Sequence, residues 1–258
     1  NIRPICLFEG IEGPLRNFKP GEIDYVIVRE NTEGLYASRG GGTVVGDDVA
    51  TDTMVITRKG VERIVQVAAE LSRQRNGAPR DGKRRVTVVA KSNVLRSFAF
   101  FRKVAAEVMA GYPDIEADYA LTDSMSVFMI ERPDFYDVVV CENFVGDLLS
   151  DLGAATVAGM GVGAAAELGD GKGYFQSSHG TAPEIASQGI ANPAASILSG
   201  ASMLTWLGNE HNDEDLISAG KRIETAVKAA LADGSARTLD IGGKAKTEQA
   251  TTAVCSLL

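Results

Sequence analysis

The chain of 258 residues is 45% hydrophobic and 23% charged, which is ordinary for a globular protein and allows one large domain or two of medium size. Its net charge of −8 argues against nucleic acid or an anionic membrane surface as a partner, and no apolar run is long enough to span a bilayer. Three widely separated cysteines and no visible secretory signal predict reduced thiols in a cytoplasmic protein. Because the sequence begins at Asn1 without Met, we expect it to start partway through a protein.

Short apolar runs rich in β-branched residues alternate with segments of helical periodicity. In chain order we predict strands at 1–8, 24–28 and 49–57, a helix at 59–75, a strand at 86–90, a helix at 98–109, a strand at 115–121, a short helix that ends at Ile130, and a strand at 138–140 that leads into a helix. Residues 38–48 are glycine-rich and predict a mobile loop, 154–173 predict a crossover between domains, and 175–193 are mostly loop. Helices at 194–207, 213–232 and 247–258 follow. The repeated βα order predicts an α/β fold with a parallel sheet.

Polar residues follow four of the predicted strands. They are Arg29, Lys91, Asp123 and Asp147. Open α/β sheets bind their ligands outside the carboxyl ends of the strands. The pattern therefore predicts a binding site at this edge of the sheet.

Asp147 and Asp151 lie four residues apart in the helix after the strand at 138–140. Two carboxylates one helical turn apart repel unless a positive group lies beside them, and their oxygens are ligands that Mg²⁺ or Mn²⁺ prefers. Asp123 could supply a third oxygen ligand. The alternative is that Asp147 and Asp151 are solvated acids that complement the helix dipole, and that Asp123 is a helix N-cap. Asn143 is the expected N-cap of the helix that carries the pair.

Three arginines, Arg3, Arg16 and Arg29, come from separate elements. Guanidinium groups bind carboxylates through two parallel hydrogen bonds, so a convergent set would suit a di- or tricarboxylate. The alternative for each arginine is a surface salt bridge. Arg29 differs from the others because it follows a buried strand directly.

Lys91 and Tyr36 are candidates for proton transfer. A lysine at the end of a buried strand is desolvated or lies near other cations, which lowers its pKa and makes it usable as a base. Tyr36 lies in a glycine-flanked turn, where its phenol could donate a proton. The alternatives are a lysine whose amine extends to water and a tyrosine that only packs.

The segment HGTAPE at 179–184 lacks the GxGxxG arrangement of the ordinary dinucleotide fingerprint. His179 could stack on a base and Glu184 could accept hydrogen bonds from a ribose diol. Taken without other support, the residues favour a structural loop.

Seven segments together match a known family in order along the whole chain. They are NIRP at 1–4, VIVRENTEGLY at 26–36, AKSNVL at 90–95, TDSMSV at 122–127, ENFVGDLLSDL at 142–152, HGTAPEIASQGIANP at 179–193 and DIGGKAKT at 240–247. The chain thereby resembles the metal-dependent β-decarboxylating 2-hydroxyacid dehydrogenases, which act on isocitrate, homoisocitrate, 3-isopropylmalate, tartrate or D-malate.

The resemblance implies a fold and a division into domains. The fold would be the two-domain α/β fold of isopropylmalate dehydrogenases, with mixed and parallel sheets flanked by helices and with the N-terminal βα units missing. Residues 1–8 and 159–258 would be the remainder of a large cofactor-binding domain. Residues 9–158 would form a small domain for substrate, metal and dimerisation.

The resemblance also implies roles for the candidate residues. Arg3 and Arg29 would hold substrate carboxylates, while Arg16 could stand in for a second substrate arginine, because Gly13 occupies the place of that residue in isopropylmalate-type enzymes. Asp147 and Asp151 would bind Mg²⁺ or Mn²⁺.

Other implied roles involve a partner subunit and a cofactor. Asp123 and Lys91 would come from the other subunit of a homodimer, Asp123 as a metal ligand and Lys91 as the base for the C2 hydroxyl, and Tyr36 would protonate the carbon that loses CO₂. The adenosine-binding loop would contain His179, Gly180, Thr181, Ala182, Glu184 and Asn192. Glu184 and Ile185 stand where NADP-dependent relatives carry Lys-Tyr, which predicts NAD.

The segment GIEGPLR at 10–16 most resembles tartrate/malate-type members, so we predict a malate-type substrate such as D-malate or tartrate. Isocitrate, homoisocitrate and 3-isopropylmalate are the alternative substrates. A non-catalytic regulatory subunit of a hetero-oligomeric dehydrogenase and a metal-binding structural module are the non-enzyme alternatives. The retention of Tyr36, Lys91 and the three aspartates argues against the regulatory subunit.

Overall fold

A parallel sheet holds the residues that the sequence places at strand ends. The computed structural model describes residues 1–258 and divides into a first unit, Asn1–Ile23 with Gly153–Leu258, and a second unit, Asp24–Leu152. The sheet of the second unit has the order β6 (Glu116–Ala120), β5 (Arg85–Val89), β7 (Val138–Cys141) and β2 (Asp24–Arg29). All three strand pairings are parallel. The carboxyl ends of these strands therefore lie at one edge, as the sequence predicts.

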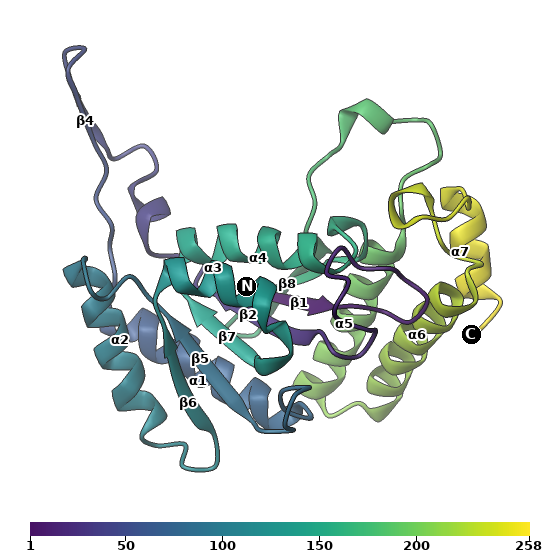
Figure 1. The fold of residues 1–258 in the computed structure, drawn as a ribbon, viewed down its shortest axis with the longest axis horizontal. Helices are drawn as coiled ribbons and strands as arrows, with labels where there is room; N and C mark the ends of the chain where they lie inside the picture. Colours follow the sequence, from purple (N-terminus) through teal and green to yellow (C-terminus); the bar gives the residue numbers. More distant parts are fainter. The chain divides into compact units, whose positions relative to one another are not determined.

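Helices cover both faces of this sheet (Figure 1). They are α1 (Arg58–Gln74), α2 (Arg96–Met109), α3 (Thr122–Glu131) and α4 (Asn143–Val157), which runs on into the first unit. The connections through α1 and α2 move across the sheet in one direction, toward β6, whereas α3 returns the chain to β7. Since such crossovers are right-handed, α1 and α2 lie on one face and α3 on the other.

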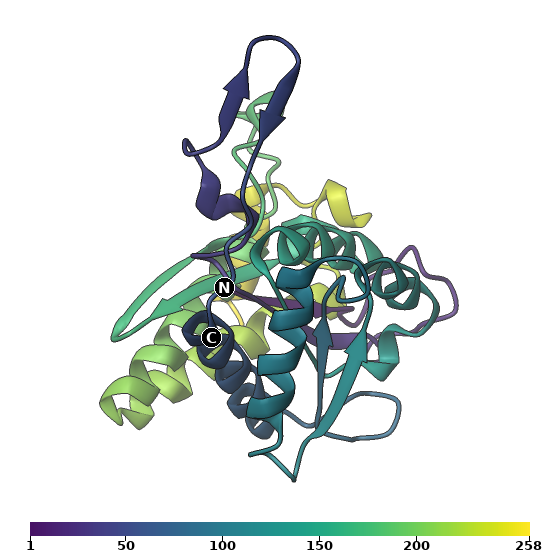
Figure 2. The ribbon, with the colours of Figure 1, turned by 90° about the vertical axis from the view of Figure 1, so that its left-hand side faces the viewer.

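A two-stranded hairpin extends from the second unit (Figure 2). Its strands are β3 (Thr43–Val45) and β4 (Val49–Thr51), paired antiparallel. The predicted loop at 38–48 therefore contains a strand, and the strand predicted at 49–57 ends at Thr51. The hairpin is hard to recognise in the sequence for two reasons. Glycines flank its strands, and neither strand packs on a core that would impose an alternation of apolar and polar residues.

The first unit combines an antiparallel sheet with three helices. The sheet contains β1 (Ile2–Cys6), β8 (Ala164–Gly169) and β9 (Lys172–Ser177), with β8 between the other two. The helices are α5 (Ala194–His211), α6 (Glu214–Asp233) and α7 (Thr247–Cys255), and short 3₁₀ turns lie at Leu35–Ser38, Pro133–Phe135, Met160–Val162, Pro183–Ile185 and Leu239–Ile241. The segment 154–173, predicted as a crossover between domains, contains β8, and Ala and Gly dominate β8 and hide its strand character. The segment 175–193 is mostly loop, as predicted, apart from the end of β9 and one short turn.

The two units do not have the bounds that the resemblance implied for the domains. Residues 9–23 and 153–158 pack with the first unit, whereas the resemblance assigned them to the small domain. The functions assigned to the two domains stay predictions. None of the helices combines the length and hydropathy of a transmembrane helix.

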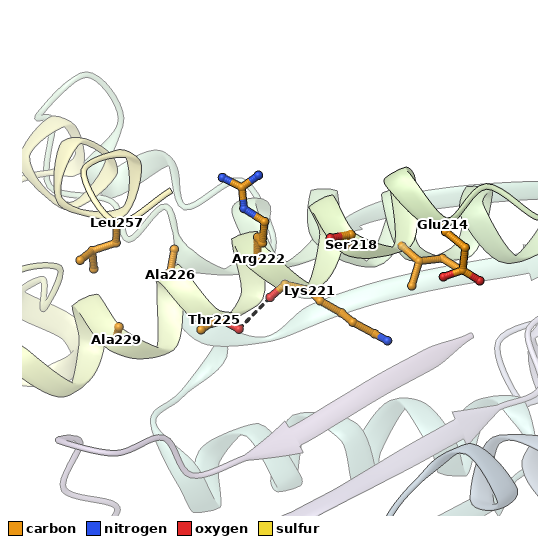
Figure 3. A pocket seen from close by; sticks show the side chains of 9 residues that line it. Glu214, Ser218, Lys221, Arg222, Thr225, Ala226, Ala229 and Leu257 are labelled. Atoms are coloured by element: carbon orange, nitrogen blue, oxygen red, sulfur yellow. Dashed lines mark hydrogen bonds between the residues drawn. The ribbon is translucent and has the colours of Figure 1, made fainter.

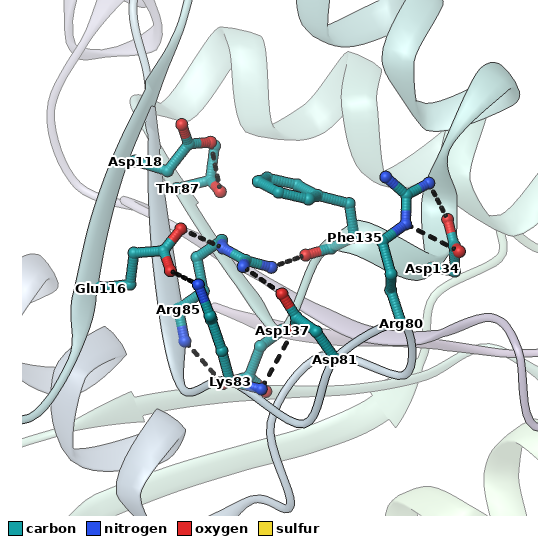
Figure 4. A network of polar contacts seen from close by, with 10 residues as sticks. All are labelled: Arg80, Asp81, Lys83, Arg85, Thr87, Glu116, Asp118, Asp134, Phe135 and Asp137. Carbon is teal, nitrogen blue, oxygen red and sulfur yellow. Dashed lines mark hydrogen bonds and ion pairs between the residues drawn. The ribbon is translucent and has the colours of Figure 1, made fainter.

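A buried arginine anchors the amino end of β5 (Figure 4). Arg85 is almost fully buried, and its guanidinium donates to Asp81 and Glu116, each at 2.8 Å, and to the backbone carbonyl of Phe135. It also stacks on the Phe135 ring at 3.8 Å from the ring centroid. The guanidinium lowers the pKa of both carboxyls. Burying this charge is tolerated because its donors are paired.

Replacing Arg85 by Met should lower the free energy of unfolding by on the order of 2–3 kcal/mol, because three charge-assisted contacts are lost while their acceptors remain. Urea unfolding followed by circular dichroism measures the change. The neighbouring exposed residue supplies a matched control: Arg84→Met should stay within about 0.5 kcal/mol of the wild type. Equal effects of the two substitutions would contradict the anchoring role of Arg85.

Candidate functional site

One carboxylate brings together two of the predicted site residues. The Oδ1 atom of Asp147 accepts a hydrogen bond from Nη1 of Arg29, and its Oδ2 accepts one from the Tyr36 hydroxyl at 2.9 Å. Arg29 ends β2, Tyr36 lies in the turn Leu35–Ser38, and Asp147 lies in the first half of α4. The alternative of an isolated surface salt bridge for Arg29 is wrong, because its side chain is mostly buried and reaches this cluster.

Asn143 holds Arg29 in place. Its Oδ1 accepts from both Nε and Nη2 of Arg29, at 2.9 and 2.8 Å, and its Nδ2 donates to the backbone carbonyl of Glu33 at 3.0 Å. The predicted N-cap role of Asn143 is wrong. The side chain of Glu142 takes that role and accepts from the backbone N–H groups of Phe144 and Val145 at 3.0 and 3.1 Å.

Tyr36 is held by a ring contact as well as by its hydroxyl. The ring meets Phe144 edge-on at a centroid distance of 5.8 Å, and the Arg29 guanidinium lies 5.8 Å from its centroid. The hydrogen bond to Asp147 raises the pKa of the Tyr36 phenol, because ionisation would remove the proton that the carboxylate accepts. Tyr36 therefore stays protonated and able to donate at neutral pH.

Asp151 and Asp123 lie in different settings. Asp151 is exposed on α4, one turn beyond Asp147. Asp123 accepts from Nζ of Lys91 at 2.5 Å, and this pair lowers the pKa of the Asp123 carboxyl. The N-cap alternative for Asp123 is wrong, because α3 begins at Thr122 with Leu121 as its cap.

The donor set fits a hard divalent cation in part. Asp147 and Asp151 offer oxygen ligands from consecutive turns of one helix, and the Asp147 side chain is 35% exposed. Within the chain, no three His, Cys, Asp or Glu side chains are grouped closely enough to hold a metal ion. Asp123 is grouped with Lys91 instead. The shared metal site of two subunits stays a prediction.

The other predicted site residues belong to the first unit. Arg3 is buried in β1, and its Nε donates to Asn1 Oδ1 at 2.9 Å, whereas Arg16 is exposed in the loop after β1. In the HGTAPE loop, Nδ1 of His179 lies 2.8 Å from the Gly180 carbonyl. Gly180, Thr181, Ala182 and Glu184 are exposed.

Asn192 is fixed at both ends of its amide. Its Oδ1 accepts from the backbone N–H of Ala194 at the start of α5, and its Nδ2 donates to Asp240 at 3.1 Å. Asp240 also accepts from the Thr238 hydroxyl at 2.5 Å. This partner of Asn192 was not identified from the sequence, because 48 residues separate the two.

A cavity of about 700 Å³ lies beside Arg29, Tyr36 and Asp147. Asn31, Arg39 and Asp52 also line it, and none of them was a predicted site residue. Arg39 and Asp52 come from the two ends of the hairpin, so their approach depends on a turn that the sequence did not reveal.

A second pocket, of about 480 Å³, lies along α6 and is lined by Glu214, Lys221, Arg222 and Leu257 among others (Figure 3). The Arg222 side chain points away from those of Lys221 and Glu214, and the Thr225 hydroxyl donates a hydrogen bond to the Lys221 carbonyl at 2.8 Å. No predicted site residue lines it. The cavity beside Asp147 is therefore the better candidate for chemistry.

The chain is similar in sequence and in fold to known dehydrogenases. A family model described as isocitrate/isopropylmalate dehydrogenase matches residues 1–254. A 3-isopropylmalate dehydrogenase of Corynebacterium glutamicum is 40% identical over 238 residues, covering 90% of this chain and 65% of that protein. A probable tartrate dehydrogenase/decarboxylase of Agrobacterium vitis is 38% identical over 264 residues, covering 100% and 70%. A crystal structure of isocitrate dehydrogenase from Methylococcus capsulatus has a TM-score of 0.86 at 37% identity, covering 99% of this chain and 72% of that one. The chain thus spans less than two thirds of the length of the first of these relatives.

The thiol next to the site gives a pH prediction. Burial raises the pKa of Cys141 to about 12, compared with about 8.5 in an unfolded chain, so the folded protein keeps a proton that the unfolded chain loses. The contribution of Cys141 to the free energy of unfolding is therefore complete below about pH 8.5 and falls as pH rises toward 12. At about pH 9 a thiol reagent should label the exposed Cys255 and leave Cys141 unmodified until urea unfolds the protein. Stoichiometric labelling of Cys141 in the folded protein would contradict its burial.

Proposed function

The chain belongs to the isocitrate/isopropylmalate dehydrogenase family, and from this premise we propose that the whole protein catalyses the NAD-dependent oxidative decarboxylation of a malate-type 2-hydroxy acid with Mg²⁺ or Mn²⁺. The observation that carries the proposal is the contact of Asp147 with both Arg29 and Tyr36. The Asp147 carboxylate contacts the Arg29 guanidinium, which can bind an acid substrate, and the Tyr36 phenol, which can donate a proton.

Arg29 binds a carboxylate of the substrate in this proposal. Its position at the end of a buried strand limits the motion of its guanidinium, and the adjoining cavity of about 700 Å³ can hold a small hydroxy acid. The family resemblance assigns Arg3 as a second arginine that binds a substrate carboxylate, with Arg16 as a further candidate. An arginine suits this task because its planar donors match the two oxygens of a carboxylate.

Asp147 and Asp151 hold the divalent cation, together with Asp123 of a second subunit. When bound, the cation polarises the C2 oxygen of the substrate. The support from this chain is the spacing of the two carboxylates on α4 and the partial exposure of Asp147. Binding requires Asp147 to exchange its contacts with Arg29 and Tyr36 for the cation.

Protons are moved by Lys91 and Tyr36. Lys91, contributed by the second subunit, takes the proton of the C2 hydroxyl as hydride leaves C2 for NAD⁺, directly or through water. CO₂ would then depart with cleavage of the C–C bond, whose electrons pass to the enolate, and the Tyr36 hydroxyl would give its proton to the carbon left behind. The proton held by Lys91 would return to the Tyr36 phenolate through water, so that no net proton is gained or lost. The products are a 2-oxo acid, CO₂ and NADH. A phenol has a pKa of about 10 in water, so the Tyr36 hydroxyl carries its proton at neutral pH.

The cofactor is NAD in this proposal. The loop from His179 to Asn192, which begins with HGTAPE, binds the adenosine, and Glu184 accepts hydrogen bonds from the ribose diol. A carboxylate at this position repels the 2′-phosphate of NADP. The exposure of Glu184 supports this assignment, since the side chain is accessible to a ligand.

A homodimer with shared active sites completes the proposal. The hairpin exposes Val44, Val45 and Val49 at 74%, 60% and 51% of their surface, although valine in a paired strand usually faces a covered side. A second copy of the hairpin would cover them. The same dimer would bring Lys91 and Asp123 of one subunit to Asp147 of the other.

The substrate of this proposal is a malate-type acid such as D-malate or tartrate. Resemblance in the GIEGPLR segment and a relative named for tartrate favour a malate-type acid. Isopropylmalate remains the second candidate, since relatives at 40% identity are named for it. Isocitrate and homoisocitrate follow. A regulatory subunit without activity would have no use for the Tyr36–Asp147 contact.

A panel of hydroxy acids tests the function directly. Purified protein that contains the whole chain is assayed for NADH formation with D-malate, tartrate, isocitrate, homoisocitrate and 3-isopropylmalate, in the presence of NAD⁺ and Mn²⁺. We expect turnover to be fastest with D-malate or tartrate and to stop when EDTA removes the cation. NADP⁺ should support at least tenfold less turnover than NAD⁺, because Glu184 repels its 2′-phosphate.

Each result has a separate meaning. Faster turnover with NADP⁺ would contradict the role of Glu184 alone. A preference for 3-isopropylmalate would replace the substrate class and keep the reaction. Absence of turnover with every acid and both cofactors would refute the catalytic proposal and favour a regulatory subunit.

A further inference from the structure

Two adjacent buried side chains connect the segments that carry the proposed reaction. Arg29, Tyr36 and Asp147 lie on three different elements, namely β2, the turn Leu35–Ser38 and α4. Glu142 and Asn143 stand at the junction of β7 and α4 and are 1% and 3% exposed. Neither was singled out as a site residue from the sequence, and the proposed reaction assigns neither of them a step.

Asn143 restricts the orientation of the Arg29 guanidinium. Its one amide oxygen accepts from Nε and Nη2, so it occupies the inner edge of the guanidinium, and Nη1 is the nitrogen that reaches Asp147. The amide of Asn143 is itself held by the Glu33 carbonyl at 3.0 Å. Arg29 can therefore offer a substrate only the outer edge, which carries Nη1 and Nη2.

Glu142 connects the Tyr36 turn to the start of α4. Its Oε1 accepts from the backbone N–H of Leu35 at 3.1 Å and of Phe144 at 3.0 Å, and its Oε2 accepts from Val145 at 3.1 Å. The residue before Tyr36 is thus bonded to the carboxylate that caps the helix carrying Asp147. This hydrogen bond fixes the backbone of the turn against the start of α4.

Two glycines show how closely these elements approach. A Cβ atom on Gly34 would lie 1.9 Å from Oε1 of Glu142, and one on Gly146 would lie 2.6 Å from Cγ of Arg29. A Cβ atom at either position would therefore force Glu142 or Arg29 to move. Gly34 also has a φ of 81°, which other residues rarely adopt. The arrangement around Glu142 and Asn143 therefore has little freedom to relax.

We propose that Asn143 and Glu142 are positioning residues for the proposed reaction: Asn143 directs the outer edge of Arg29 at a substrate carboxylate, and Glu142 fixes the Tyr36 turn against the first turn of α4. This inference rests on the proposed function. Asn143 acts through Arg29, so its loss should weaken the binding of the hydroxy acid selectively. Its hydrogen-bond partners, Arg29 and Glu33, both belong to the second unit, whereas the loop assigned to NAD belongs to the first.

The substitution Asn143→Leu tests the inference, because leucine has a similar volume and cannot accept from Arg29. The KM for the preferred hydroxy acid should rise by on the order of tenfold or more, as expected for lost hydrogen bonds to a charged group. The KM for NAD⁺ and the Kd for Mn²⁺ without substrate, measured by electron paramagnetic resonance, should stay close to wild type. Asn209→Leu on the exposed surface of α5 is the matched control and should change none of these values.

A double substitution tests the route of the effect. In an Arg29→Met background, the further change Asn143→Leu should leave hydroxy acid affinity, measured by calorimetry with Mn²⁺ present, unaltered, because the group that Asn143 directs is gone. An additional loss of affinity in that background would overturn the claim that Asn143 acts through Arg29.

The remaining outcomes are distinguishable. Circular dichroism and thermal unfolding monitor the fold, and Asn143→Ser provides a smaller second variant. Unfolding of both variants would show a structural role for Asn143 and overturn the inference. If the wild type is active and Asn143→Leu has the same KM for the hydroxy acid, the inference is overturned as well. A wild type without activity toward any hydroxy acid would refute the proposed function, and the inference with it.

Discussion

The buried carboxylate of Glu142 is the interaction on which the arrangement of this site depends. It follows β7 directly and accepts three backbone hydrogen bonds, two from the start of α4 and one from Leu35. Bonds of this charged kind contribute about 1.5–3 kcal/mol each, which offsets the cost of burying the charge. Because one side chain serves both the helix and the turn, the distance between Asp147 and Tyr36 is set by the end of the sheet rather than by surface loops.

The same end of the sheet determines the electrostatics of the cluster. Arg29 compensates the charge of Asp147, and Tyr36 donates to the same carboxylate. The repulsion expected between Asp147 and Asp151 is therefore reduced before any cation binds. A cation that binds Asp147 would displace both contacts, which would release the arginine toward an acid substrate and the phenol toward the reacting carbon. The contacts of Asp147 with Arg29 and Tyr36 would thus hold both side chains beside the site until the cation and the substrate bind.

Much of the arrangement could be predicted from the sequence, and the remainder has specific causes. The run from Val138 to Val140, followed by polar residues, identified the strand end that carries Glu142, and the four-residue spacing identified the Asp147–Asp151 pair. The family resemblance is confirmed by the match over residues 1–254. The predicted N-cap role of Asn143 was wrong. The preference of Asn for helix starts suggested a cap, but its side chain hydrogen-bonds Arg29, which lies 114 residues away in the sequence. The strand β8 was missed because its residues Ala164 to Ala166 have no strand preference of their own, and its pairing with β9 is set by tertiary contact.

The chain holds Arg29, Tyr36 and Asp147 in one cluster and Lys91 with Asp123 in another, so the central claim is that two subunits complete each active site. The most direct measurement mixes two inactive variants, Tyr36→Phe and Lys91→Met, after partial unfolding and refolding that allows subunits to exchange. If the two residues act from different subunits, each mixed dimer contains one intact site, and an equal mixture should recover about a quarter of the wild-type activity. Recovery of no activity, with exchange of subunits verified by native mass spectrometry, would contradict the account.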